Sequence, residues 1–474
     1  MSRCRILLSA IAASLTLAVV AAVPAAAQVP VPDVQGPIAA TATPGDPSRN
    51  YPFFASDDGL ARDGYVEEEF FISGTATNYV VNGTSTATVG DPAGAPYKTR
   101  VVVRRPARAA KFNGTVVVEW YNVSNQYDQE VDWLQSHEHF VREGYAWVGV
   151  SAQRAGVHSA TGLRAWNPAR YGSLDLTAGG TLNGDQLSYD VFSQAGQAVW
   201  DGAILNDFRV RQVLATGHSQ SAMRLRNYYN SVHPLANVYD GFVMHGLVGP
   251  GTVRTDIPTP VFKLQSESDV LLLGQAASRQ PDNPYLRTWE VAGTTHGDWK
   301  LIIEHGPLRF RDLGTYPDDY PGRPPSGCAA PPFSRIPWYM VQNRAYDWLR
   351  DWAMKGKQPP SAPLIELSST QPAVAVRDEF GNALGGLRLP QFEVPVARDT
   401  GLNSGPGFCF LHGAHVRFDR ATIDALYPRF TDYVKAIFRE TARAQSAGYI
   451  DPADAAAIRR HALRNGPVPM EPLF

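Results

Sequence analysis

A strand, a tight turn and a helix around Ser219 constrain this chain more than any other feature. Residues 210–216 are mainly apolar, as in a buried strand, and residues 222–229 are typical of a helix. Between them stands Gly-His-Ser-Gln-Ser, residues 217–221. We interpret this segment as a sharp turn that lifts a serine hydroxyl above the end of a sheet. Strand and helix nearly touch beside such a turn, so its flanking residues must be small. Ser221, in place of the usual glycine, is a mild departure.

A serine hydroxyl needs a histidine to take its proton and an acid to orient that histidine. Two later segments supply both, each just after a predicted strand. Gln-Ser-Glu-Ser-Asp at 265–269 follows one strand, and Gly-Thr-Thr-His at 293–296 follows the next. The carboxyl ends of parallel strands meet at one edge of a sheet, where such sheets bind ligands. The order serine, acid, histidine is that of α/β-hydrolases, so we expect the three side chains to converge.

The choice of base and acid has alternatives. We predict His296 as the base, and His245 and His305 are the alternatives. His245 is less favoured because no strand that carries an acid lies between it and Ser219. Asp269 and Glu267 are two residues apart, so a strand would point both to the same side and periodicity does not choose. We favour Asp269, which lies where the turn after the strand usually carries the acid.

The developing oxyanion needs N–H donors. We expect one from the backbone of Gln220 and the other from the loop after the strand near residue 120, where Tyr121 or Asn122 is the candidate. Trp120, Tyr121 and Trp299 are expected to flank the site.

The N-terminus indicates export. Arg3 and Arg5 precede an apolar stretch, and three alanines end at residue 27. We predict a cleaved signal peptide over residues 1–27 and a secreted or periplasmic protein; a membrane anchor is the less favoured alternative. Removing two arginines and no acid would shift the formal net charge from −2 to −4. This weak charge argues against nucleic acid as a partner, and no later segment predicts membrane insertion.

Two cysteines follow the leader, Cys328 and Cys409. In an exported chain they predict a disulfide; two buried free thiols are the alternative. His137 with His139, and His412 with His415, lack the acids or cysteines of a zinc site. We predict no metal and no cofactor.

Strands alternate with helices along most of the chain, which predicts a mostly parallel sheet. We expect a core over residues 28–304, a Pro-rich cap loop and a core-packing helix over 305–355, and an extension packed on the core over 356–474. Within the core, residues 155–188 are rich in Gly and Asn and predict a surface loop.

The chain resembles a large bacterial family of often exported α/β-hydrolase domain proteins. The similar segments are Thr-Gly-His-Ser-Gln-Ser at 216–221, Glu-Trp-Tyr-Asn-Val-Ser at 119–124, Gln-Ser-Glu-Ser-Asp-Val at 265–270, Ala-Gly-Thr-Thr-His at 292–296 and Gly-Gly-Leu-Arg-Leu-Pro at 385–390. The resemblance implies an α/β-hydrolase fold, with helices on both faces of the sheet, and a triad of Ser219, Asp269 (or Glu267) and His296. It names no substrate.

Together these features predict an exported serine hydrolase that cleaves carboxylic esters through an acyl-enzyme. The expected partner is a small-molecule or polymer-borne ester, and the oligomeric state stays open. The alternatives are an amidase, peptidase or acyltransferase on the same triad, and a non-catalytic binding protein with the same fold.

Overall fold

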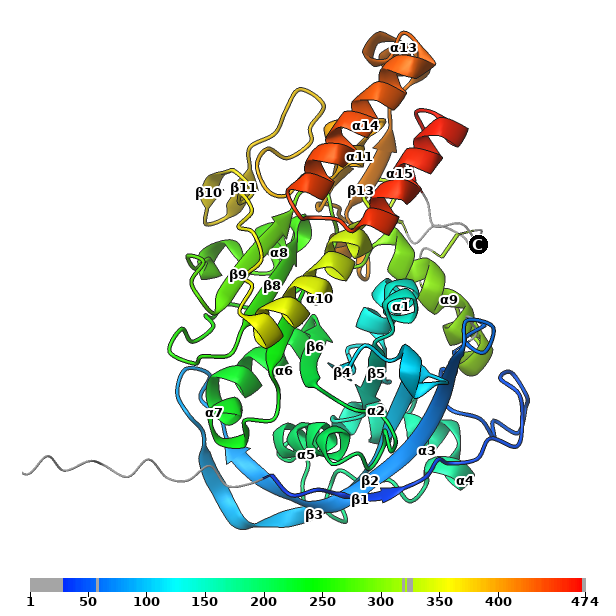
Figure 1. Ribbon diagram of the computed structural model, residues 1–474, viewed down its shortest axis with the longest axis vertical. Helices are drawn as coiled ribbons and strands as arrows, with labels where there is room; N and C mark the ends of the chain where they lie inside the picture. Colours follow the sequence, from blue (N-terminus) through cyan, green and yellow to red (C-terminus); the bar gives the residue numbers. More distant parts are fainter. Residues whose placement is uncertain (1–28, 57–58, 318–319, 322–326, 471–474) are drawn as a thin grey trace, which may run out of the picture.

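A nine-stranded sheet forms the centre of the molecule (Figure 1). The computed structural model describes residues 29–56, 59–317, 320–321 and 327–470, so the predicted signal peptide lies outside the described residues. The spatial order of the strands is β1-β2-β3-β5-β4-β6-β7-β8-β9. Their bounds are β1 Asp33–Gln35, β2 Tyr65–Val80, β3 Thr88–Pro106, β4 Thr115–Trp120, β5 Ala146–Val150, β6 Gln212–His218, β7 Gly241–His245, β8 Val261–Ser266 and β9 Leu286–Val291.

Six neighbouring strands, β4 to β9, are parallel, while β1, β2 and β3 pair antiparallel and β3 joins β5 antiparallel. Every residue of β4 to β9 is buried. Strands covered on both faces read as continuous apolar runs, which is why they could be recognised in the sequence. In Figure 1, β2 and β3 curve along one end of the molecule and the C-terminal helices occupy the other.

Helices cover both faces of the sheet, and adjacent residues of β4 demonstrate it. The carboxylate of Glu119 accepts hydrogen bonds from the first turn of α1 (Val131–Glu143), at 2.9 and 3.0 Å. Trp120 points the opposite way and packs on Phe192 of α5 (Ser188–Trp200), with ring centroids 4.7 Å apart. Side chains alternate along a strand, so α1 and α5 lie on opposite faces. The predicted fold class is confirmed.

The remaining core helices agree with this arrangement. α6 (Gln220–Asn227) follows β6 and is continued by a π-helical turn and α7 (His233–Ala236). α8 (Glu267–Leu272) follows β8. α10 (Trp338–Lys355) lies on the α1 face, where the hydroxyl of Tyr346 is 2.9 Å from that of Thr216 in β6.

Two predicted loops contain helices. Residues 155–188 include α2 (Arg154–His158), α3 (Leu163–Trp166) and α4 (Pro168–Tyr171). α9 (Trp299–Leu313) runs across the predicted boundary at 304/305, with Pro307 inside it. Residue 306 of this helix needs to be glycine, because the ring of Tyr320 packs so closely that a Cβ would overlap it. Tertiary packing therefore overrides the Gly-Pro helix-breaking signal.

The C-terminal region packs beside β8 and β9. It contains β10 (Leu367–Thr370), β11 (Ala373–Ala375), α11 (Pro390–Glu393), β12 (Ala397–Thr400), α12 (Cys409–His412), β13 (Ala414–Arg417), α13 (Arg420–Leu426), α14 (Phe430–Ser446) and α15 (Pro452–Asn465). The predicted disulfide is present and joins Cys328 to Cys409. Among the described helices, none combines the length and apolar character needed to cross a bilayer.

Candidate active site

Ser219 occupies the sharp turn between β6 and α6. Its φ of 60° and ψ of −118° are strained for a residue with a Cβ, and such strain is typical of functional turns. Its backbone N–H donates to the carbonyl of His245 in β7, at 3.0 Å. The Ser221 hydroxyl donates to the carbonyl of His218 (2.8 Å) and accepts from its N–H (3.0 Å). These two hydrogen bonds of Ser221 therefore stabilise the turn.

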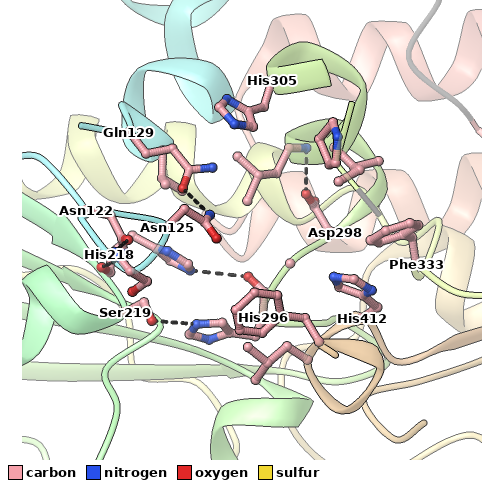
Figure 2. Close-up of a pocket in the computed structure, with 18 of the residues that line it drawn as sticks. Asn122, Asn125, Gln129, His218, Ser219, His296, Asp298, His305, Phe333 and His412 are labelled. Carbon is pink, nitrogen blue, oxygen red and sulfur yellow. Dashed lines mark hydrogen bonds between the residues drawn. The ribbon is translucent and has the colours of Figure 1, made fainter. Parts of the chain in front are cut away.

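The structure brings the three predicted triad residues together. His296 Nε2 lies 2.8 Å from the Oγ of Ser219 (Figure 2), and His296 Nδ1 lies 2.6 Å from Oδ1 of Asp269. Asp269 is held by a capping box at the start of α8, where its Oδ2 accepts the N–H of Ser266 at 2.6 Å. This chain of contacts can relay a proton from serine to imidazole and orient the ring.

The carboxylate of Glu267 points away from His296 and binds other groups. Its carboxylate accepts the N–H of Gly293, just before the histidine loop, at 2.8 Å. It also accepts from Arg377 (2.7 Å), from the Thr400 hydroxyl (2.8 Å) and from the N–H of Gly401 (3.1 Å). The side chain is fully buried and ties the C-terminal region to the site. Of the two acids that the sequence left open, Asp269 is the one that contacts His296.

The backbone N–H groups expected to bind the oxyanion differ in whether they are already hydrogen-bonded. The N–H of Gln220 begins α6 beside Ser219 and has no acceptor among the described residues. The backbone N–H groups of Tyr121 and Asn122 are already paired, with the carbonyls of Val150 (3.4 Å) and Gln129 (3.0 Å). Both backbone donors expected from this loop are therefore already hydrogen-bonded, one to β5 and one within the loop itself.

The side chain of Asn122 does reach the site. It lines the pocket, and its Nδ2 donates to the carbonyl of His218 at 3.0 Å. An amide nitrogen carries two hydrogens, so a second N–H remains for a bound oxygen.

Two further histidines, His218 and His245, lie beside His296; His245 was an alternative base in the sequence, and His218 was not singled out. The ring of His218 lies between those of His296 and His245, with centroids 4.5 Å from each. Burial, with these two neighbours, lowers the pKa of His218 well below its ordinary value. The neutral ring donates from Nε2 to the carbonyl of His296 at 3.2 Å. His218 therefore positions the loop that carries His296.

His245 completes this stack. Its Nδ1 donates to Asp132 of α1 (2.9 Å), and its Nε2 accepts from the indole of Trp338 (2.6 Å). The ring is thus held as a buried support at the end of β7, away from Ser219.

A cavity of about 240 Å³ opens above Ser219. In Figure 2, Phe333 and His412 lie across it from Ser219, and His305 of α9 lies above. The walls come from the loop after β4, from α9 and from segments near the disulfide. Its lining is Asn122, Ser124, Asn125, Gln129, Val131, His218, Ser219, His296, Gly297, Asp298, Leu301, Ile302, His305, Arg309, Pro317, Phe333, Phe408, Leu411 and His412.

The aromatic residues expected to flank the site lie elsewhere. Trp120 and Tyr121 are buried in the core. The guanidinium carbon of Arg335 lies over the ring of Trp299, 3.5 Å from the ring centroid. Phe333 and Phe408 supply the aromatic surface instead. Both belong to segments whose approach to Ser219 depends on tertiary packing alone.

One described group of side chains has the spacing of a metal site, formed by His137, Glu138 and Glu304. The ammonium of Lys300 already lies 3.2 Å from Glu138 and 3.1 Å from Glu304. The ammonium of Lys300 therefore already supplies a positive charge to these two carboxylates. Two other histidines weighed for metals have acid partners: His139 contacts Asp347 and Asp451, and His415 contacts Asp399.

Residues 34–460 match the profile of a family described as "Alpha/beta hydrolase domain". The chain belongs to this family. As an alpha/beta hydrolase domain protein it is assigned to the hydrolases, and the resemblance recognised from its motifs is confirmed. A search of the curated proteins found no match.

Similar solved structures include three esterases. One is a fungal esterase from Rhizomucor miehei, with 10% identity and a TM-score of 0.28, covering 54% of this chain and 86% of that chain. A glucuronoyl esterase from Solibacter usitatus has 10% identity and a TM-score of 0.26, with coverages of 48% and 76%. Esterase Est22 has 12% identity and a TM-score of 0.29, with coverages of 53% and 77%. Likeness at this level carries no argument about the substrate of this alpha/beta hydrolase.

Proposed function

We propose that this protein is a serine hydrolase that cleaves carboxylic esters. The observation that carries the proposal is the unbroken contact chain from Ser219 through His296 to Asp269, at 2.8 and 2.6 Å, at the base of a pocket. An aligned serine, histidine and aspartate provide a nucleophile, a general base and the group that orients the base.

The reaction proceeds in two halves. Oγ of Ser219 attacks the ester carbonyl while Nε2 of His296 takes its proton. The tetrahedral oxyanion accepts hydrogen bonds from the N–H of Gln220 and the side-chain amide of Asn122. Collapse expels the alcohol, which receives the proton from His296, and leaves an acyl-serine. Water then attacks with the same base, and collapse frees the acid and restores Ser219. Asp269 holds the imidazole in its tautomer throughout and stabilises the imidazolium.

We further propose that the protein is exported after cleavage of residues 1–27. The basic start, the apolar stretch and the alanines before residue 28 support this. The Cys328–Cys409 disulfide is consistent with an oxidising compartment.

A panel of p-nitrophenyl esters and matched p-nitroanilides tests the reaction class. We expect ester hydrolysis, much slower amide hydrolysis, and labelling of Ser219 by a fluorophosphonate probe. Ser219→Ala should lower kcat by about 10⁵- to 10⁶-fold and abolish labelling. Ser173→Ala, which removes an exposed hydroxyl outside the pocket, is the control and should still be labelled.

The alternatives predict different results. Amide turnover equal to ester turnover would replace the esterase by an amidase or peptidase, and acyl transfer to an added alcohol faster than to water would indicate an acyltransferase. A folded protein that neither turns over an ester nor reacts with the probe would be a binding protein.

A further inference from the structure

The candidate site contains a cation that no part of the proposed reaction uses. Arg309 lines the same cavity as Ser219, and among the described lining residues it is the only arginine or lysine. Within the described residues, which omit 318 and 319, its guanidinium forms no hydrogen bond and no ion pair, and its Nε is buried without a partner. Other side chains of the described residues also bury unpaired atoms, but Arg309 is the one positively charged group among the described residues that line the cavity, where a ligand could satisfy the unpaired donor.

Arg309 lies on the face of α9 that forms one wall of the pocket. Leu301, Ile302, His305 and Arg309 all line the cavity, at the spacing of one helical face. α9 begins three residues after His296 and leads away from it, so the Cα of Arg309 stands about 15 Å along the axis from the first helical residue. Helical side chains lean toward the N-terminus, so the guanidinium is carried back toward the start of α9, the end nearer to His296 in the chain.

Among the residues that the structure describes, the neighbours of Arg309 do not neutralise its charge. His305 accepts or donates one hydrogen bond, with the hydroxyl of Tyr127 at 3.1 Å. Burial, with the nearby charge of Arg309, lowers the pKa of His305 to about 3, so its ring is neutral at physiological pH. Asp298 is the one acid among the described lining residues. It caps the start of α9, where its Oδ1 accepts from Leu301 and Gln135, about 16 Å along the axis from Arg309.

The cavity that holds Ser219 and Arg309 offers apolar as well as polar surface. Val131, Leu301, Ile302, Phe333 and Leu411 contribute to the apolar part. A ligand in this cavity therefore meets the hydroxyl of Ser219, several apolar side chains and a guanidinium that has no partner among the described residues.

We propose that the substrates of this site are esters that carry a carboxylate, separated from the scissile ester by an apolar spacer and held by Arg309. The planar guanidinium matches a carboxylate with two parallel hydrogen bonds and is the side chain best suited to that group. This inference rests on the proposed hydrolase function and adds its substrate class.

Mono-p-nitrophenyl esters of dicarboxylic acids provide the test, in a length series of succinate, adipate, suberate and sebacate. Each is compared with the neutral analogue in which a carboxamide replaces the free carboxylate. We expect the wild type to prefer the carboxylate by about 10- to 100-fold in kcat/KM, because a hydrogen bond to a charged group adds that much. The preference should be largest for the longer acids, which span the distance to Arg309.

Variants locate the source of the preference. Arg309→Gln should bring the carboxylate/carboxamide ratio to about one, and Arg309→Lys, which keeps the charge but not the planar fork, should leave an intermediate ratio. Arg420→Gln removes an exposed arginine of α13 and should leave the wild-type ratio. A wild-type ratio of one or below, or an Arg309→Gln ratio equal to that of the wild type, would overturn the proposal.

Binding separates this inference from the reaction on which it rests. Ser219→Ala should bind mono-p-nitrophenyl suberate about 10- to 100-fold more tightly than its carboxamide in calorimetry, and Ser219→Ala/Arg309→Gln should bind the two equally. If the wild type cleaves neither ester while this binding difference persists, the reaction proposal fails and carboxylate recognition stands. If esters are cleaved without any binding difference, the carboxylate inference alone fails.

Discussion

At the scale of single residues, the two acids after β8 divide two tasks between them. Asp269 contacts His296, whereas Glu267 contacts the loop before it and the C-terminal region. Both carboxylates are buried and begin the same short helix. Their different directions arise because residues 267 and 269 are already helical, so the strand periodicity that would align them no longer applies.

Substitution should separate these tasks. Asp269→Asn removes the partner of His296 Nδ1 and should lower kcat by about 10³- to 10⁴-fold with little change in melting temperature. Glu267→Gln is the matched variant. It breaks a buried contact with Arg377 and should lower the free energy of unfolding by about 2–4 kcal/mol, with less than a tenfold change in kcat. Steady-state kinetics measures the change in kcat of both variants, and urea unfolding measures the change in their free energy of unfolding. The reverse pattern would make Glu267 the triad acid.

At the scale of elements, α15 docks through a buried acid. Asp454 begins α15 and accepts a hydrogen bond from Asn343 of α10 at 3.2 Å. Burial, together with the nearby charge of Asp451, raises the pKa of Asp454 to about 7. The folded state therefore holds a proton that the unfolded state releases near pH 4. This contribution to stability is present at low pH and is lost as the pH rises through 7.

Asp454→Asn imitates the protonated acid at every pH. Between pH 5 and pH 8 the wild type should lose about 2 kcal/mol of unfolding free energy relative to this variant. Chemical denaturation at both pH values measures the difference, in which all shared titrations cancel. Asp424→Asn, at an exposed position on α13, is the control and should show no such trend. A pH-independent difference for Asp454→Asn would contradict the raised pKa.

At the scale of the whole molecule, the Cys328–Cys409 disulfide joins segments 81 residues apart. The two segments also run together through backbone hydrogen bonds, from Ala329 to Ser404 and from Phe333 to His412. Both contribute to the wall of the pocket, through Phe333 on one side and Phe408 on the other. The covalent link therefore belongs both to stability and to the shape of the site.

Cys328→Ser/Cys409→Ser should lower the free energy of unfolding by about 2–4 kcal/mol, because a long loop regains freedom in the unfolded chain. We expect KM to rise more than kcat falls, since the wall loosens while the triad stays on the sheet. Thermal unfolding and ester kinetics with and without reductant provide the measurement. Reduced wild type should behave as the double variant does. A variant that matches oxidised wild type in both would show that the other contacts suffice.

The sequence alone determined the sheet and the approach of Ser219, His296 and an acid after β8. Buried parallel strands are continuous apolar runs, and their carboxyl ends share one edge, so residues 219, 269 and 296 could be placed together without coordinates. Local order could not choose between Glu267 and Asp269, because that choice depends on where α8 begins. The helix across Pro307 and the pocket wall of Phe333, Phe408 and Arg309 depend on contacts between segments that are separated in the sequence, which no local pattern encodes.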